Sequence, residues 1–362
     1  MEEKQKSRPL EDIVVVIAIL LLLAAGTYAA YVHWIKPSEI KPLETPEAIP
    51  TATPEATPTP TPEPIPEGMA PETARQEGVY TFLLAGQDQM SGSTDTIIVG
   101  RLDTVRHEIN FVSIPRDTLL NVDAEIRKIN AVYQGSLNFG GTGIDMLNYH
   151  VKSMVGFVPD CYAVINLNTF IELIDAIGGV DFDVPYPVDY YFSDIRRDLY
   201  VCLEPGLQHL NGEEAMAVCR NRAGYGGADL QRIEVQHAFL KSCMDQFLSL
   251  GTIPHIREVL DVLERGVRTD LSPANMAWFL KQALKCKSEN IRFYTMPTDV
   301  ALLQGYSYDL PQISEWISMI NQCLNPYSDA EIGYGNLNVV FCNGPGSYWS
   351  TVGYLDGDWY YR

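Results

Sequence analysis

Charged residues stand beside three of the strands that the sequence predicts. They are Asp88 after an apolar stretch at 80–84, Asp95 just before one at 96–102, and Arg116 with Asp117 after one at 109–114. Ligand sites in α/β proteins usually lie at the ends of strands, so these side chains are candidates for binding or catalysis. Aspartate is also an ordinary turn-forming residue, and type and position alone leave a structural role open.

A second group combines arginines with a glutamine. Arg220 and Arg222 are two residues apart where a helix should have ended, and on an extended segment they share a face. Arg232 and Gln236 are four apart on the next predicted helix, and Asp229, one turn earlier, can orient Arg232. Guanidinium groups fit phosphate oxygens in a bidentate manner, which makes this group suited to phosphate binding. Surface salt bridging is the alternative.

Several other kinds of site are absent from the sequence. There is no GxSxG, GxxxxGK[ST] or HExxH motif. The seven cysteines contain no CxxC pair and none stands near a histidine at zinc-finger spacing, which argues against a zinc site. The net charge of -20 argues against a nucleic-acid partner, because phosphate contacts over a broad surface need clustered Lys and Arg.

The elements that must position these residues alternate between strands and helices from Tyr80 onward. The pattern predicts strands at 80–84, 96–102, 109–114, 162–167, 180–184 and 291–295, and helices at 143–157, 169–177, 211–219, 230–248, 253–266 and 273–285. Asn211 is the expected N-cap of its helix, with Glu214 as capping-box partner. This alternation predicts an α/β fold with α-β-α layers.

The N-terminal region predicts a membrane anchor. Residues 13–33 are apolar and uncharged over a length that spans a bilayer, whereas a cleaved signal peptide, the alternative, has a shorter apolar core. Lys4, Lys6 and Arg8 precede the span, so residues 1–12 should be cytoplasmic and the rest of the chain should lie outside the cytoplasm.

The chain beyond the span divides into three parts by composition. Residues 34–78 alternate Pro with Thr, Glu and Ala, which predicts an extended linker outside the membrane. Residues 79–325 carry the α/β pattern and should form the functional domain. Residues 326–362 form a Gly- and Tyr-rich C-terminal tail with one strand-like stretch at 337–341.

The ordered set of short motifs resembles the LytR-CpsA-Psr (LCP) family of bacterial cell-envelope proteins. The matching pieces are Gly86-Gln87-Asp88, Thr94-Asp95-Thr96, Ser113 to Asp117, Lys128 to Ala131 with Tyr133, Ile177 to Val180, Leu207 to Ala215, Arg220-Asn221-Arg222, and Asp229 with Arg232 and Gln236. Each piece is weak singly, but their order over roughly 170 residues, behind an anchor and a linker, is specific. Arg268 to Ser272 is similar to the family's usual continuation.

The resemblance implies an Mg²⁺-dependent phosphotransferase with a mixed central sheet. Such a protein moves a glycopolymer from a polyprenyl-diphosphate carrier to peptidoglycan and releases polyprenyl phosphate. The implied residues are Asp88 and Asp95 for Mg²⁺, Arg116, Asp117, Arg220 and Arg222 for catalysis, and Lys128, Asp229, Arg232 and Gln236 for substrate binding. It also implies an apolar pocket for the prenyl chain, which we expect the helix face of Ile144, Leu147 and Val151 to line.

The sequence departs from the family pattern at two positions. Many members have Arg where this chain has Ser93 and Val235. A protein that binds polyprenyl phosphate, or assists envelope assembly or its regulation, with little turnover is therefore the alternative. Direct transcriptional work is disfavoured by the short cytoplasmic segment, which has no DNA-reading element.

Overall fold

The computed structural model describes residues 75–88, 92–135, 143–192, 199–221, 229–249, 253–344 and 346–355. The predicted cytoplasmic segment, the anchor and nearly all of the linker lie outside these residues. Within the described part of the chain, no helix is both long and apolar enough to cross a membrane.

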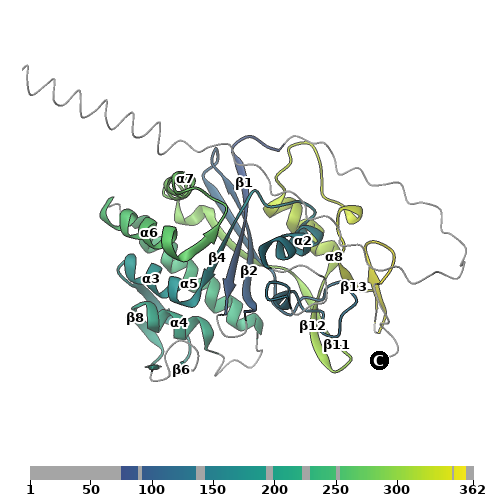
Figure 1. Ribbon diagram of the computed structural model, residues 1–362, viewed down its shortest axis with the longest axis horizontal. Helices are drawn as coiled ribbons and strands as arrows, with labels where there is room; N and C mark the ends of the chain where they lie inside the picture. Colours follow the sequence, from purple (N-terminus) through teal and green to yellow (C-terminus); the bar gives the residue numbers. More distant parts are fainter. Residues whose placement is uncertain are drawn as a thin grey trace, which may run out of the picture.

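A six-stranded sheet forms the centre of the molecule (Figure 1). Its strands are β1 (Val79–Gln87), β2 (Thr94–Asp103), β3 (Glu108–Ser113), β4 (Cys161–Asn166), β9 (Val267–Thr269) and β10 (Ile291–Thr295), in the order β10-β3-β2-β1-β4-β9. The pairs β1–β2, β2–β3 and β4–β9 are antiparallel, whereas β1–β4 and β3–β10 are parallel. The predicted mixed α/β fold with a mixed central sheet is confirmed.

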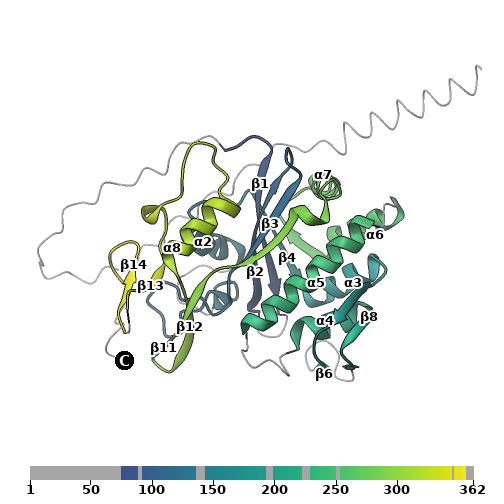
Figure 2. The ribbon, with the colours of Figure 1, turned by 180° about the vertical axis from the view of Figure 1, so that it is seen from behind.

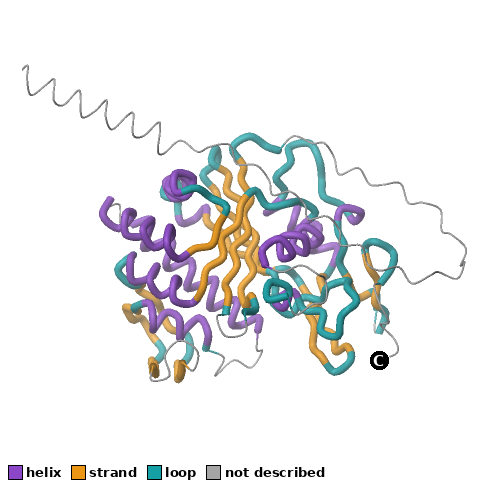
Figure 3. Tube along the Cα trace, viewed as in Figure 1, coloured by secondary structure: helices purple, strands orange, loops and turns teal. Residues whose placement is uncertain are grey.

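Helices cover both faces of this sheet, as Figures 1 and 3 show. One layer contains α2 (Gly143–Val155), α8 (Ile313–Met319) and a π-helical turn (Ile320–Leu324). The other contains α3 (Leu167–Ala176), α4 (Gly212–Arg220), α5 (Asp229–Ser249), α6 (Ile253–Gly266) and α7 (Pro273–Ala283). The view from behind in Figure 2 shows the long α5 crossing this second face.

The two faces of the sheet differ in burial. On β1, Leu83 and Ala85 are buried in the core shared with α2 and α8, while Phe82 and Leu84 on the opposite side are only partly buried. This alternation follows from the two-residue period of a strand. The layer of α5 therefore covers its face of the sheet less completely than the layer of α2 covers the other.

The prediction that one face of α2 lines a pocket for the prenyl chain is wrong. Ile144, Leu147 and Val151 are 4%, 0% and 0% exposed and lie in the filled core on the α2 side of the sheet. Spacing by three and four identifies an apolar helix face but does not say whether a ligand or the protein itself fills the space beside it. These residues stabilise the fold.

Four strand pairs lie outside the central sheet. They are β5 (Val180–Val184) with β8 (Gly206–Leu210), β6 (Val188–Phe192) with β7 (Leu199–Leu203), β11 (Thr298–Leu303) with β12 (Tyr306–Pro311), and β13 (Val340–Cys342) with β14 (Tyr348–Ser350). Short 3₁₀ turns occur at Ile129–Ala131, Ser288–Asn290 and Tyr334–Asn336. Of the strands in these pairs, the sequence predicts only β5 and, displaced by a few residues, β13.

Two further features are the capping box of α4 and the packing of the C-terminal tail. The predicted capping box at the start of α4 is present, because the Glu214 amide donates to the Asn211 side chain and the Asn211 amide donates to Glu214. The C-terminal tail packs on the domain, with Ile332, Leu337 and Val339 buried in the main core.

Candidate functional site

Asp88 lies in a turn between β1 and β2. Its backbone amide donates to the carbonyl of Ser93 at 2.9 Å, and the Gly92 amide donates to the Asp88 carbonyl at 2.9 Å. The Asp88 side chain is 17% exposed, and its carboxylate lies 3.7 Å from the guanidinium of Arg220. The predicted residues Asp88 and Arg220 are thus brought together, and Ser93 helps to close the turn that holds Asp88.

Arg220 occupies the last turn of α4, so the prediction that it follows the helix on an extended segment is wrong. A cation at this end of a helix interacts favourably with the helix dipole. Its guanidinium also lies over the ring of Tyr190 on β6, 5.7 Å from the ring centroid. Contact with an aromatic face and with Asp88 holds the Arg220 side chain at the edge where β1 ends.

A second set of charges surrounds Arg116. Its Nη1 donates to Asp95 at 3.1 Å, and its Nε lies 3.9 Å from Asp117. The other carboxylate oxygen of Asp117 lies 2.9 Å from Lys128 Nζ. Arg116, Asp117 and Lys128 are each about one-fifth exposed, so solvent and a ligand can reach them. The structure therefore brings together four residues that the sequence analysis singled out.

Backbone hydrogen bonds fix the segment that carries Arg116 and Asp117. The Asn130 amide donates to the Arg116 carbonyl at 3.1 Å, and the Asp309 amide of β12 donates to the Asp117 carbonyl at 3.1 Å. Lys128 also lies over the ring of Tyr308, 5.7 Å from its centroid. The β11–β12 hairpin, which the sequence did not predict, supports this part of the site.

Helix α5 contributes two of the predicted residues. Arg232 is only 4% exposed, and Gln236 donates its side-chain amide to the Cys219 carbonyl at 3.1 Å. That bond ties α5 to the end of α4, next to Arg220. Arg222 lies outside the described residues, as does the side chain of Asp229, whose backbone begins α5.

The positive and negative groups of the described site are nearly balanced. The cations joined by described contacts are Arg116, Lys128 and Arg220, and the carboxylates are Asp88, Asp95 and Asp117. The oxygens of an anionic ligand that enters this site can replace the carboxylates that now contact the cations. Such an exchange keeps the guanidinium groups compensated throughout.

The carboxylates of Asp88 and Asp95 are the groups in this site that suit a divalent cation. They come from neighbouring strands, β1 and β2, at the same end of the sheet. Mg²⁺ commonly uses one or two carboxylates and completes its shell with water and substrate phosphate. In the described part of the chain no group of three or more His, Cys, Asp or Glu is placed to hold a metal by itself. The donor set therefore fits Mg²⁺ shared with a phosphate better than a closed protein cage.

An aromatic surface lies on the α5 side of the sheet, six residues before Asp88 along β1 and five residues before Arg116. Phe82 and Phe111 meet edge to face at 5.7 Å, and Phe111 stacks on Phe293 at 4.8 Å. Met244 and Leu248 of α5 pack against the same cluster. All five side chains are only partly buried, although they lie between a sheet and a helix layer. This aromatic surface can accept further apolar atoms.

His237 on α5 adds a polar contact to the aromatic surface. Its Nε2 lies 2.7 Å from the Ser113 hydroxyl on β3, and its ring is tilted against Phe293 at 5.5 Å. Burial lowers the pKa of His237 to about 4, so the ring is neutral near pH 7. Sequence reasoning missed this contact, although His237 directly follows Gln236.

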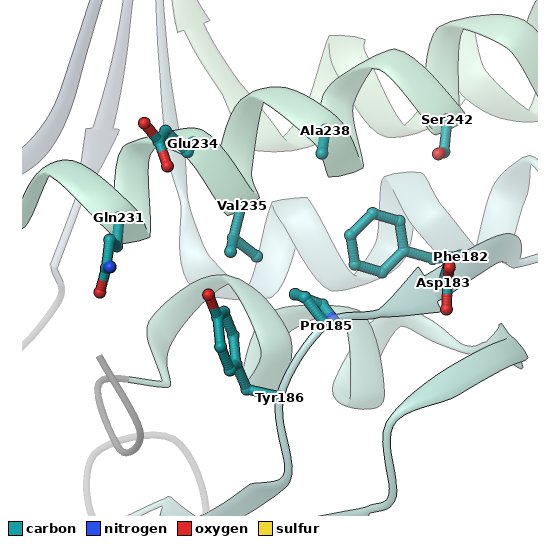
Figure 4. Close-up of a pocket in the computed structure, with 9 residues that line it drawn as sticks. All are labelled: Phe182, Asp183, Pro185, Tyr186, Gln231, Glu234, Val235, Ala238 and Ser242. Carbon is teal, nitrogen blue, oxygen red and sulfur yellow. The ribbon is translucent and has the colours of Figure 1, made fainter. Parts of the chain in front are cut away.

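A separate pocket of about 410 Å³ lies on the other side of α5, between that helix and the segment after β5 (Figure 4). It is lined by Phe182, Asp183, Pro185, Tyr186, Gln231, Glu234, Val235, Ala238 and Ser242. The sequence did not predict this pocket, and the position of Val235 in its wall was not foreseen.

Cations and carboxylates at one end of a mixed sheet, and an accessible aromatic surface farther along the same sheet, define an α/β domain able to bind an amphiphile with an anionic head. Comparison with known families agrees with this class. The LytR_cpsA_psr family model matches residues 52–323, and the chain belongs to this family.

Two curated relatives from Bacillus subtilis carry transferase names. The chain is 29% identical over 198 residues to polyisoprenyl-teichoic acid–peptidoglycan teichoic acid transferase TagV, with 54% of this chain and 48% of TagV covered. It is 24% identical over 312 residues to the transferase TagU, with 85% and 92% covered. The chain thus spans about half of TagV but nearly all of TagU.

Solved structures share the fold. The crystal structure of Bacillus subtilis TagV matches with a TM-score of 0.56 at 23% identity, covering 68% of this chain and 96% of the TagV chain in that crystal structure. A structure described as TagT bound to LI-WTA matches with a TM-score of 0.53 at 19% identity, covering 68% and 89%. At these identities the likeness establishes the fold.

Proposed function

We propose that this protein transfers a glycopolymer from a polyprenyl-diphosphate carrier to peptidoglycan and releases polyprenyl phosphate. The single observation that carries the proposal is that one sheet carries both the charged site, at its strand ends, and the aromatic surface, which begins about 20 Å along β1 from Asp88. A polyprenyl diphosphate has an anionic head and a long apolar chain, and those two surfaces match its two parts. Membership of the LytR_cpsA_psr family and the transferase names of TagV and TagU support the same activity.

In this proposal the arginines hold the diphosphate. Arg116 and Arg220 would reach it from different elements, because one follows β3 and the other ends α4. Arg232 adds a nearly buried positive charge, and Lys128 completes the cationic wall beside Asp117. Phosphoryl transfer depends mainly on positioning and on compensation of charge on the phosphoryl oxygens, which guanidinium groups supply.

The bond changes of the proposed reaction are simple. An acceptor hydroxyl oxygen forms a bond to the phosphorus that carries the glycan. The bridging P–O bond breaks, polyprenyl phosphate leaves, and the hydroxyl proton is released. Asp117 contacts both Arg116 and Lys128, so we assign it the role of holding these two cations toward the diphosphate.

We further propose that Asp88 and Asp95 hold Mg²⁺ when substrate is present. The ion would supply positive charge to the phosphate oxygens. The two carboxylates now contact Arg220 and Arg116, at 3.7 and 3.1 Å. Binding of Mg²⁺ together with diphosphate would compensate all four side chains at once.

We propose that the prenyl chain lies against the aromatic surface defined by Phe82, Phe111, Phe293, Met244 and Leu248. These side chains keep accessible apolar area inside a layered domain, where full burial is the usual outcome. Each CH₂ group removed from water there contributes about 0.8 kcal/mol to binding. A chain of many isoprene units can therefore be held without polar contacts.

The site would work outside the cytoplasm, tethered by residues 13–33 as a single membrane anchor. Supporting this proposal are the uncharged span, the basic residues before it and the Pro-rich linker after it. Protease added to intact cells after wall removal should release the domain. Protection of the domain from protease would contradict this orientation.

Binding without efficient turnover is the second candidate function, and one observation favours it. Val235 is 6% exposed and packs in an apolar core, so it supplies no cation where many family members have Arg. Ser93 is 9% exposed, and it too is uncharged at a position where many family members have Arg.

The deciding experiment measures release of polyprenyl phosphate from a diphosphate-linked saccharide by the purified domain. Peptidoglycan acceptor and Mg²⁺ are each supplied or withheld, and a chelator provides the metal-free arm. We expect release that depends on both Mg²⁺ and acceptor, and loss of release in Arg220→Ala. Tight lipid binding without Mg²⁺-dependent release would favour the second candidate, and Ser93→Arg and Val235→Arg would then be tested for gain of activity.

A further inference from the structure

The pocket on the outer side of α5 has a chemistry unlike that of the charged site. Its floor is apolar, with Phe182 and Val235 only 4% and 6% exposed. Its rim is polar and includes the ring of Tyr186, which is 37% exposed. A volume of about 410 Å³ lies within the range of small-ligand pockets.

The charge of the described rim argues against a second phosphate site. Asp183 and Glu234 line the pocket, and none of its nine lining residues is Lys or Arg. The chain as a whole carries a net charge of -20. An anionic repeat of a glycopolymer would be repelled there, whereas a neutral ligand with hydroxyl donors finds carboxylate acceptors.

The remaining lining groups suit a sugar. Gln231 supplies an amide, Ser242 a hydroxyl, and Tyr186 an aromatic face that can lie against the apolar side of a pyranose ring. Val235 and Ala238, on the side of α5 that faces the Tyr186 segment in Figure 4, offer apolar surface for the methyl of an acetamido group.

A hydrogen bond and a short segment connect the pocket to the charged site. Asn221, the residue after Arg220, donates its side-chain amide to the Pro187 carbonyl at 3.0 Å, and Pro187 directly follows Tyr186. Tyr190, which lies under Arg220, is four residues beyond Tyr186, or about 13 Å along an extended segment. A ligand of a few sugar units can therefore reach from the pocket to the diphosphate.

We propose that this pocket binds an uncharged, N-acetylated sugar of the peptidoglycan strand that accepts the glycopolymer. The inference rests on the proposed function and adds to it the place where the acceptor is held. The lipid-linked donor can also contain neutral sugars, but its polymer carries anionic groups in the teichoic acids that TagV and TagU are named for. The acidic rim therefore favours the acceptor strand over the donor.

The first test measures the binding of a neutral N-acetylglucosamine tetramer to the purified domain by calorimetric or NMR titration. The variants are Tyr186→Ala and Asp183→Asn, both at exposed positions that should not affect folding. Matched controls are Tyr191→Ala, which removes a 58% exposed ring from β6, and Asp245→Asn, which removes an exposed carboxylate from α5 outside the pocket. We expect about tenfold weaker binding for Tyr186→Ala and little change in either control.

The second test uses transfer kinetics to identify the source of the sugar. Tyr186→Ala should raise the KM for peptidoglycan strands and leave the KM for the lipid donor unchanged. A rise in the donor KM alone would overturn the assignment to the acceptor. Failure of the wild-type domain to bind the tetramer, or equal loss in the controls, would overturn the sugar site. Tetramer binding without any transfer would reject the proposed function while supporting the pocket as a glycan site.

Discussion

The carboxylate of Asp88 lies 3.7 Å from the guanidinium of Arg220, which joins the end of β1 to the end of α4. Each residue also has a second support, since Asp88 is held in a closed turn and Arg220 lies over Tyr190. A pair fixed from both sides presents its charges at a defined position before any ligand arrives. Such preorganisation is what stabilisation of a phosphoryl-transfer transition state requires.

Asp88→Asn should separate function from stability. The ion pair is partly exposed, so its loss should change the free energy of unfolding by about 1 kcal/mol or less. If Asp88 holds Mg²⁺, transfer should fall by about 100-fold or more. Chemical denaturation and the release assay measure the two quantities. Asp245→Asn, which breaks the 3.2 Å contact with Lys241, is the control. Full activity in Asp88→Asn would contradict a metal-binding role.

Asp95→Ala and Arg220→Ala should differ in their effect on lipid binding. Loss of Asp95 removes a proposed metal ligand but leaves Arg116 able to contact the diphosphate, so transfer should be lost while much of the binding survives. Loss of Arg220 removes a group that contacts the diphosphate in the ground state as well, so both should fall. Binding of polyprenyl phosphate and its release are measured side by side. Equal loss of binding in both variants would contradict the division of roles.

The charged site was largely predictable because its residues follow from strand ends and helix ends. Asp88, Asp95 and Arg116 stand where strands begin or end, and a sheet brings such positions to one edge. The capping box at Asn211 fixed the start of α4, but the end of the helix was predicted one residue too early, before Arg220. Local rules of this kind are carried by a few neighbouring residues.

The supporting residues were not predictable from the same rules. Tyr190 and Tyr308 belong to hairpins whose strands have mixed polar and apolar faces, so their periodicity is weak. Their contacts with Arg220 and Lys128 depend on tertiary packing between distant segments. The assignment of Leu147 to a ligand pocket was wrong because periodicity cannot distinguish a filled core from an open one.

A charge placed on the aromatic surface should weaken lipid binding, and the loss of affinity should be larger for lipids with longer prenyl chains. Met244→Glu puts a carboxylate beside Phe111 and Phe293, where we propose that the prenyl chain lies. Affinity for a long-chain polyprenyl phosphate should fall by about tenfold or more, and affinity for a two-isoprene analogue should change much less. Met319→Glu, at a partly buried methionine on the opposite helix layer, controls for general destabilisation. Equal losses in the two variants would argue against the proposed chain path.

Two histidines should make stability depend on pH. Burial lowers the pKa of His150 on α2 and of His237 on α5 to about 4, from an ordinary value of 6.5. The folded protein therefore keeps both rings neutral at a pH where the unfolded chain takes up protons. The linkage has a definite sign, because stability falls as the pH is lowered wherever the unfolded state binds more protons.

The free energy of unfolding should accordingly decrease as the pH is lowered from 7.5 to 5, by about 2 kcal/mol for His150 and somewhat less for the more accessible His237. Urea denaturation at several pH values measures this slope. His150→Gln or His237→Gln should each flatten it. His209→Gln is the matched control, because the hydrogen bond with Asp181 raises the pKa of His209. Protonation of His209 therefore stabilises the folded protein at low pH. Removing this ring cannot flatten the loss of stability that occurs as the pH is lowered. A slope unchanged in both His150→Gln and His237→Gln would show that carboxylates alone control the acid sensitivity of this domain.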